Sequence, residues 1–291
     1  MSSTLADDAP PRSALGLLWR LLTAGGRNRA DLCYAFMGTR NCPSRDCMYL
    51  NLGYWPGTQD YCTAAQAMVD LLGDAAGIQR GETVVDAGCG FGDQDVRLAQ
   101  RHDPARIHAI NVTALQIEHA RQRHAEPRID WHVASATALP FADASVDRVV
   151  SLEAAFHFDT REAFLREAFR VLRPGGRLAV IDLVALERDG RIVTGGLRGR
   201  LERWSSQVPE ANLYGMTRYA EILRGIGYAA PSLRSIADDV VPPYLDYMRK
   251  VLNDPVEGPR FHPLIRETMR RSGNPFASND YILVTADKPA A

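Results

Sequence analysis

Residues 83–99 read TVVDAGCGFGDQDVRLA and decide the fold class of this chain. A β-branched apolar run enters a turn with glycines at alternate positions, and apolar residues at helical spacing follow it. The stretch therefore predicts a strand, a tight loop and a helix. Because glycine tolerates positive φ and lets a ligand approach the backbone, we expect Gly88 and Gly90 to bind a nucleotide-type ligand.

Asp86, at the end of the predicted strand, indicates which kind of ligand the loop binds. A phosphate loop holds an anion at a helix N-terminus, and a carboxylate here would repel it. Gly92 also comes one residue too early for the dinucleotide fingerprint Gly-x-Gly-x-x-Gly, so a nicotinamide oxidoreductase is the least favoured alternative. An acidic loop suits a cationic ligand, such as the amino group and sulfonium of S-adenosylmethionine. These residues resemble motif I of the class I S-adenosylmethionine-dependent methyltransferases.

Strand and helix patterns alternate from about residue 83 to 181, which predicts a parallel sheet with right-handed crossovers and helices on both faces. The turn LRPGG at 172–176 resembles the family's motif before its fifth strand. The resemblance implies an α/β, Rossmann-like methyltransferase fold with seven strands, the last of them antiparallel. The patterns predict helices over 63–76, 116–124, 161–172 and 216–225, and further strands over 106–112, 129–133, 145–152, 231–236 and 281–285.

The expected domain organisation is a methyltransferase domain over 63–291, preceded by a helical lid segment over 13–62 and a disordered tail over 1–12. Apolar residues from Leu15 to Leu22 fall at helical spacing. This helix either simply packs on the domain or acts as a mobile lid, a role that resembles that of N-terminal helices in the family. An irregular insertion over 183–217 and a second insertion over 241–275, with a helix over 244–271, are expected to shape an acceptor pocket.

An aromatic stretch, MYLNLGYWPG at 48–57, resembles the Tyr-Ile-Asn-Leu-Gly-Tyr-Trp segment of erythromycin-type O-methyltransferases of antibiotic biosynthesis. The resemblance places this region near the methionine end of the cofactor. An aromatic face there can stabilise a sulfonium by cation–π attraction, and Tyr49 and Tyr54 are the candidates. Plain core packing is the alternative use of such a cluster.

The remaining cofactor contacts are expected where later strands end. Asn111 lies about 20 residues beyond the loop, where a ribose-binding side chain is usual, and its amide can bond a ribose hydroxyl in place of the usual acid. Ser135 stands where the family commonly has an acid that binds the adenine amino group, so adenine recognition would use backbone groups. The full set of further expected cofactor contacts is Asn111, Val112, Gln116, Ser135, Ala136 and Leu152.

Two titratable residues follow the fourth predicted strand, at the edge of the sheet where ligands bind in open α/β folds. His157 matches the histidine in the Leu-Glu-Ser-x-x-His pattern of related O-methyltransferases. An imidazole titrates near neutral pH and can accept a hydroxyl proton, so His157 is the expected catalytic base. Glu153 is the second expected catalytic residue, and it would either orient His157 or meet the cofactor.

These features predict transfer of a methyl group from S-adenosylmethionine to a hydroxyl of a small natural-product acceptor, such as a sugar, polyketide or phenol. A nitrogen or carbon acceptor, for example an isoprenoid, would use the same cofactor site. Related folds that act as cyclases, and non-catalytic binding proteins, are further alternatives.

The composition of the chain limits which partners it can be expected to bind. The formal net charge is −1 with no basic block, which favours neither nucleic acid nor a membrane surface. No targeting or membrane-spanning segment is evident, so cytoplasmic localisation is expected. Cys42 and Cys47 lack a second pair or a nearby histidine, and no ligand-spaced cluster of histidines and carboxylates is visible, so no metal is expected. The oligomeric state is open, with a homodimer as one option.

Overall fold

The computed structural model describes residues 42–193, 208–263, 266–267 and 274–290. The expected tail, the Leu15–Leu22 helix and parts of both expected insertions lie outside these residues. Two compact units can be distinguished, one of Met1–Met48 and Leu245–Pro275, the other of Tyr49–Tyr244 and Phe276–Ala291. In the part of the chain that is described, no helix has the length and apolar character needed to cross a membrane.

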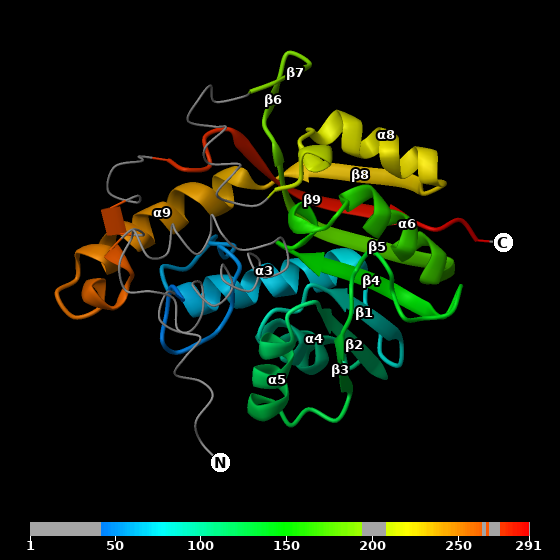
Figure 1. Ribbon diagram of the computed structural model, residues 1–291, viewed down its shortest axis with the longest axis horizontal. Coiled ribbons are helices and arrows are strands. Elements are labelled where there is room, and N and C mark those ends of the chain that lie inside the picture. Colours follow the sequence, from blue (N-terminus) through cyan, green and yellow to red (C-terminus); the bar gives the residue numbers. More distant parts are fainter. Residues whose placement is uncertain (1–41, 194–207, 264–265, 268–273, 291) are drawn as a thin grey trace, which may run out of the picture. The chain divides into compact units, whose positions relative to one another are not determined.

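The second unit is built on a seven-stranded sheet with the order β3-β2-β1-β4-β5-β9-β8 (Figure 1). The first five strands in this order pair in parallel, and β9 pairs antiparallel to both of its neighbours. This confirms the predicted fold class. The strands are β1 Thr83–Ala87, β2 Arg106–Asn111, β3 Ile129–Val133, β4 Val146–Leu152, β5 Leu172–Ala185, β8 Ala229–Ser235 and β9 Asn279–Asp287, with a separate hairpin of β6 Glu187–Arg188 and β7 Arg191–Ile192.

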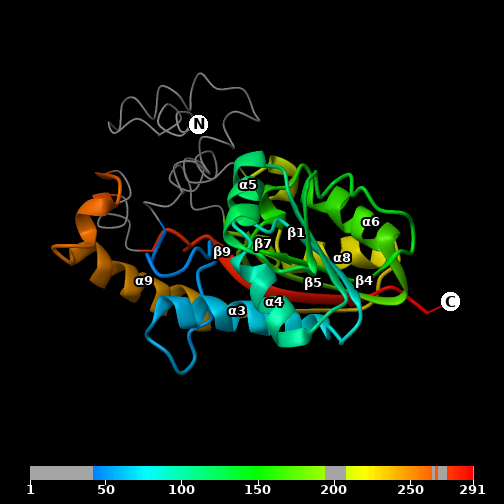
Figure 2. The ribbon, with the colours of Figure 1, turned by 90° about the horizontal axis from the view of Figure 1, so that it is seen from below.

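Helices cover both faces of this sheet. On one face α3 packs with α4, and on the other α6 packs with α8 (Figure 2). Apolar side chains of β1, β4 and β5 and of α6 and α8 form a fully buried core, which includes Val85, Val149, Phe164 and Leu223. The helices are α3 Tyr61–Ala76, α4 Asp93–His102, α5 Ala114–Arg123, α6 Arg161–Val171, α8 Met216–Ile226 and α9 Ala237–Asn253, with short 3₁₀ turns η1 Ala155–His157, η2 Glu210–Asn212 and η3 Gly258–Arg260.

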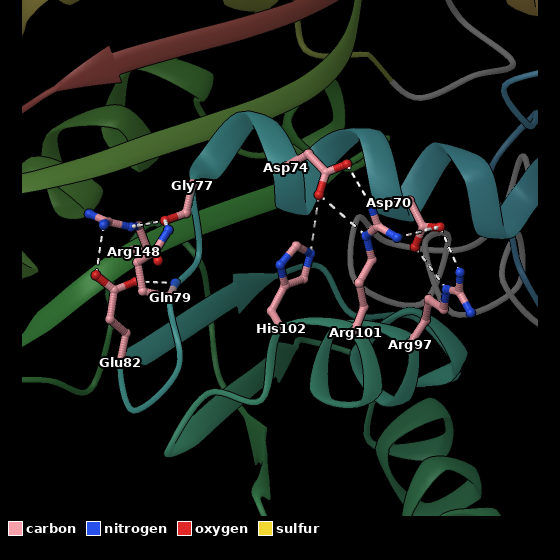
Figure 3. A network of polar contacts seen from close by, with 9 residues as sticks. All are labelled: Asp70, Asp74, Gly77, Gln79, Glu82, Arg97, Arg101, His102 and Arg148. Atoms are coloured by element: carbon pink, nitrogen blue, oxygen red, sulfur yellow. Dashed lines mark hydrogen bonds and ion pairs between the residues drawn. The ribbon is translucent and has the colours of Figure 1, made fainter.

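Ion pairs between charged side chains join α4 to α3 (Figure 3). Arg97 binds Asp70 through two parallel bonds, Nε to Oδ1 at 2.8 Å and Nη2 to Oδ2 at 2.6 Å. One turn further along both helices, Arg101 Nη2 lies 2.7 Å from Asp74 Oδ2. Because the bidentate geometry fixes direction as well as distance, the pairs set the position of α4, whose N-terminus carries the glycine loop.

The second insertion differs from its predicted form. The sequence predicted helix from Tyr244, whereas α9 begins at Ala237 and contains Pro242 and Pro243 in its interior. Each proline lacks a backbone N–H donor, so α9 continues through these two positions without the hydrogen bonds that other residues would donate there. In the first insertion, β5 continues to Ala185 and the hairpin of β6 and β7 follows, where irregular structure was predicted.

Candidate active site

The glycine loop follows β1, and its backbone confirms the predicted turn. Gly88, Gly90 and Gly92 all have positive φ, of 95°, 57° and 85°. A Cβ at Gly88 would overlap the Ala154 side chain, and one at Gly92 would overlap Trp131. These two glycines are therefore required for packing inside the protein, a reason that the sequence did not reveal. At Gly90 a Cβ would lie 3.3 Å from the flexible tip of Leu50, so this position is less crowded.

Asp86 lies beneath the loop. Its side chain is fully buried, and Oδ2 accepts a hydrogen bond from Gln94 Nε2 of α4. Burial raises the pKa of Asp86 to about 6, and the equally buried Asp95 has a pKa raised well above its usual value by burial and by Asp86. Two neighbouring buried carboxyls titrate as a pair. Asp86 can therefore attract a cationic ligand by its negative charge, although its buried side chain offers the ligand no exposed atom to contact.

Asn111 and Gln116 form a buried amide pair where β2 ends. Asn111 Nδ2 donates to Gln116 Oε1, and both residues are at most 8% exposed. With its nitrogen held in this way, Asn111 keeps Oδ1 as an acceptor, which is the group that a ribose hydroxyl requires. The expected ribose contact is therefore chemically consistent with the local structure.

Apolar side chains stand exposed beside this pair. Val112 is 56% exposed, Leu115 44% and Val133 53%, and they follow or end two neighbouring strands, β2 and β3. Exposed apolar groups gathered at one place commonly mark a ligand surface. An adenine ring has flat apolar faces that such side chains can cover, so these residues fit the adenine end of the cofactor. The sequence analysis named Val112 as an expected cofactor contact and did not name Leu115 or Val133.

Ser135 and Ala136 form the turn after β3. Ser135 Oγ lies 2.8 Å from Thr137 Oγ1 and accepts a bond from the Thr137 backbone N–H at 3.2 Å. Its hydroxyl is thus engaged inside the turn, while Ala136 is 4% exposed and packs in the core. Recognition of adenine by backbone groups here stays a prediction.

The aromatic segment, residues 49–57, is held against α3 by buried hydrogen bonds. Tyr61 Oη donates to the carbonyl oxygens of Tyr49 at 2.9 Å and of Asn51 at 2.7 Å. Tyr49 is 6% exposed, and burial raises the pKa of its hydroxyl to about 12. Tyr54 is more accessible, and its backbone N–H donates to Ala64 O at 2.8 Å. Tyr54 is thus the better placed of the two to reach a ligand.

Glu153 binds the same segment from the other side. It follows Leu152, the buried last residue of β4, and has a positive φ of 49°. Its Oε1 accepts a hydrogen bond from the backbone N–H of Leu52 at 2.7 Å, and burial raises its pKa to about 8. The sequence left open whether Glu153 serves His157 or the cofactor. The observed contact is a third arrangement, in which Glu153 positions the aromatic segment.

His157 lies at the end of η1, and its partly buried ring packs against Phe156 with centroids 3.9 Å apart. A buried polar network fixes this turn. Asn212 Nδ2 donates to Phe156 O at 3.1 Å and to Phe158 O at 2.7 Å, on either side of His157. Asp182 Oδ1 accepts from Phe156 N at 3.1 Å.

Arg161 completes that network from the start of α6. Its side chain is fully buried, its Nε lies 2.7 Å from Asp182 Oδ2, and its Nη1 donates to Asn212 O at 2.9 Å. Its guanidinium also lies 4.7 Å from the centre of the Tyr214 ring. Sequence reasoning missed all three polar residues of the network, because they lie on separate elements and belong to no motif.

Three of the predicted site residues, Asp86, Asn111 and Leu152, lie at the carboxyl ends of β1, β2 and β4. Ser135 and Glu153 come just after β3 and β4, and these four strands are neighbours in the sheet. Ligands bind at the carboxyl ends of the strands in open α/β folds. No metal was expected because the sequence shows no ligand-spaced cluster of histidines and carboxylates. That premise is wrong for the folded chain, since folding brings His108, Asp130 and His132 together as a group of potential ligands. The three residues lie on two strands and are too far apart in the sequence to form a recognisable motif.

An acidic glycine loop, an amide acceptor for ribose and an exposed apolar surface at adjacent strand ends define a Rossmann-like site for a cationic nucleoside. A methyltransferase domain family matches residues 85–180. Over 91% of this chain and 91% of the relative, the sequence is 33% identical to erythromycin 3''-O-methyltransferase of Saccharopolyspora erythraea. It is 29% identical to 27-O-demethylrifamycin SV methyltransferase of Amycolatopsis mediterranei, over 82% of this chain and 90% of that one.

Solved structures share the fold. The cyclase SpnF matches with a TM-score of 0.71 at 21% identity, covering 92% of this chain and 98% of that one. Geranyl diphosphate C-methyltransferase from Streptomyces coelicolor A3(2) matches with a TM-score of 0.62 at 20% identity, covering 78% and 80%. The chain belongs to the S-adenosylmethionine-dependent methyltransferases, in the branch that resembles the erythromycin-type O-methyltransferases, and S-adenosylmethionine is its methyl donor.

Proposed function

We propose that this enzyme methylates a hydroxyl of a small natural-product acceptor, a sugar, polyketide or phenol, with His157 as the general base. The observation that carries the proposal is the place of His157, at the carboxyl end of β4 on a turn fixed by Asn212 and Asp182. Support comes from the relatives, whose names specify O-methylation of erythromycin and methylation of a demethylrifamycin.

The chain's own residues have separate tasks in this proposal. Asn111 and the apolar surface of Val112 hold the nucleoside, and Asp86 favours the cationic amino group by its charge. The bound cofactor supplies a methyl group on a cationic sulfur. A hydroxyl is a weak nucleophile while protonated, so His157 would accept its proton as the new carbon–oxygen bond forms and the methyl–sulfur bond breaks, with S-adenosylhomocysteine as the leaving group. Positioning of the acceptor in line with the methyl group supplies much of the acceleration.

The test is turnover with labelled cofactor and a panel of glycosylated polyketides, phenols and prenyl compounds, followed by product mass and NMR. One added methyl on oxygen is expected. His157→Ala should lower turnover by about 10²-fold or more while affinity for S-adenosylhomocysteine stays unchanged. Near-normal turnover of His157→Ala would exclude the base assignment. Methyl on carbon or nitrogen, or turnover without cofactor consumption, would exclude O-methylation itself.

A further inference from the structure

Two neighbouring strands at the edge of the sheet carry three metal-ligating side chains on one face. In the parallel register of β2 and β3, His108 pairs with Asp130 and Ile110 pairs with His132. Residues two apart on a strand share a face, so all three side chains lie on the same face as Ile110. None of them belongs to the cofactor or catalytic residues described above.

The distances match those around a single small ion. His108 Nδ1 lies 3.2 Å from His132 Nε2 and 3.5 Å from Asp130 Oδ2, and the three ligand atoms all lie within 4.8 Å of one another. Tetrahedral bonds of about 2.0–2.1 Å place ligand atoms roughly 3.3–3.4 Å apart. The two shorter separations therefore have about the spacing that an ion requires, and the third, at most 4.8 Å, would have to shorten when the ion binds.

The surroundings hold these side chains in place. Arg106 Nη1 lies 3.4 Å from Asp130 Oδ1, which leaves Oδ2 directed to His108. The Phe141 ring packs on both imidazoles, with centroids 4.7 Å from His108 and 5.7 Å from His132. Arg170 Nη1 in turn binds Phe141 O at 2.7 Å. Such outer contacts orient ligands before an ion arrives, which raises affinity.

We propose that His108, Asp130 and His132 bind one divalent transition-metal ion, and that zinc is the ion this ligand set fits best. Two imidazoles and one carboxylate suit zinc, whereas magnesium and calcium prefer oxygen ligands throughout. Water would complete the coordination. The ion would join the edge strand β3 to β2, the two strands that lead to Ser135 and Asn111. Its role is therefore to stabilise this edge of the sheet, and not to take part in methyl transfer.

The experiment uses the full chain after removal of metal by chelation. Calorimetric titration with zinc sulfate should give one site with micromolar or tighter affinity, and zinc should raise the melting temperature. X-ray absorption at the zinc edge should show imidazole nitrogen and carboxylate oxygen without sulfur. Absence of binding, or a sulfur ligand from a cysteine, would overturn the proposal.

Single substitutions test which side chains bind the zinc ion. His108→Gln, His132→Gln and Asp130→Asn should each weaken zinc binding by about tenfold or more, because each removes one ligand of a three-ligand site. His119→Gln, a histidine on α5 outside the group, is the matched control and should keep wild-type affinity. Unchanged affinity in the three ligand variants would contradict the assignment. If any of them fails to fold, the absorption spectrum of the wild type still decides the ligand set.

Discussion

Glu153 Oε1 accepts a hydrogen bond from the backbone N–H of Leu52 at 2.7 Å, and so joins the end of β4 to the aromatic segment. Burial raises the pKa of this carboxyl to about 8, which means that it is mostly protonated at neutral pH. A neutral acceptor can be replaced by an amide of the same shape. The contact of Glu153 with Leu52 thus positions the aromatic segment through a hydrogen bond.

The first prediction compares Glu153→Gln with Glu153→Ala. The glutamine carbonyl can still accept from Leu52, so affinity for S-adenosylhomocysteine should stay near wild type. Alanine leaves that buried N–H without a partner, at a cost of about 1–3 kcal/mol, and should weaken affinity about tenfold or more. Calorimetric titration measures both. Equal loss in the two variants would show that the ionised carboxylate is needed.

The second prediction concerns stability against pH. The folded-state pKa of Glu153, about 8, lies above the ordinary glutamate pKa of 4.5, so the folded protein binds more protons than the unfolded chain between these limits. Stability from this group is present below about pH 4.5 and is lost as pH rises towards 8, by at most about 1.4 kcal/mol per pH unit. Urea unfolding at pH 5, 6.5 and 8 should show wild type losing stability relative to Glu153→Gln. A constant difference would contradict the raised pKa.

The third prediction concerns cofactor affinity and Asp86, whose pKa is raised to about 6 by burial. Only the ionised carboxyl attracts the cofactor's amino cation, so affinity for S-adenosylhomocysteine should fall several-fold as pH drops from 7 to 5. Asp86→Asn should bind more weakly and should lack this pH dependence. Calorimetric titrations at three pH values measure the affinity of both proteins. If the affinity of Asp86→Asn fell with pH as steeply as that of the wild type, a group other than Asp86 would be responsible for the pH dependence.

The fourth prediction tests the packing of the glycine loop. Gly88→Ala would place a methyl group onto the Ala154 side chain at a backbone φ of 95°, and should destabilise the protein by about 2–4 kcal/mol. Adding Ala154→Gly removes the overlap but leaves the backbone strain, so the double variant should recover part of the loss. Chemical denaturation measures all three proteins. No recovery in the double variant would mean that backbone strain alone accounts for the glycine.

The fifth prediction compares two arginines of α6. Arg161→Met leaves Asp182 buried without its partner and should cost about 3–5 kcal/mol. Arg166, whose side chain is 60% exposed and pairs with Glu162 at 2.6 Å, is the matched control, and Arg166→Met should cost less than about 1 kcal/mol. Urea denaturation gives both values. Similar losses would show that the buried network contributes no more than a surface ion pair.

Much of the fold was predictable because its signals are local. The run at 83–87 and the glycines after it predict β1 and its loop from their own residues, and five residues at 129–133 predict β3 without error. The sequence predicts helix only from Tyr244, whereas α9 begins at Ala237 and contains two prolines, which are unfavourable inside a helix. Local preference thus gives way where tertiary contacts outweigh it.

Local residue patterns are enough to predict the fold class, the cofactor class and the strand ends at which a ligand is expected, since the carboxyl ends of parallel strands meet at one edge of the sheet. Which groups meet across separate elements depends on how the chain folds. Only folding shows that Glu153 holds Leu52, that Arg161 and Asn212 support the turn of His157, and that His108 faces His132. These contacts join residues on different elements, so no short stretch of sequence contains the information that pairs them.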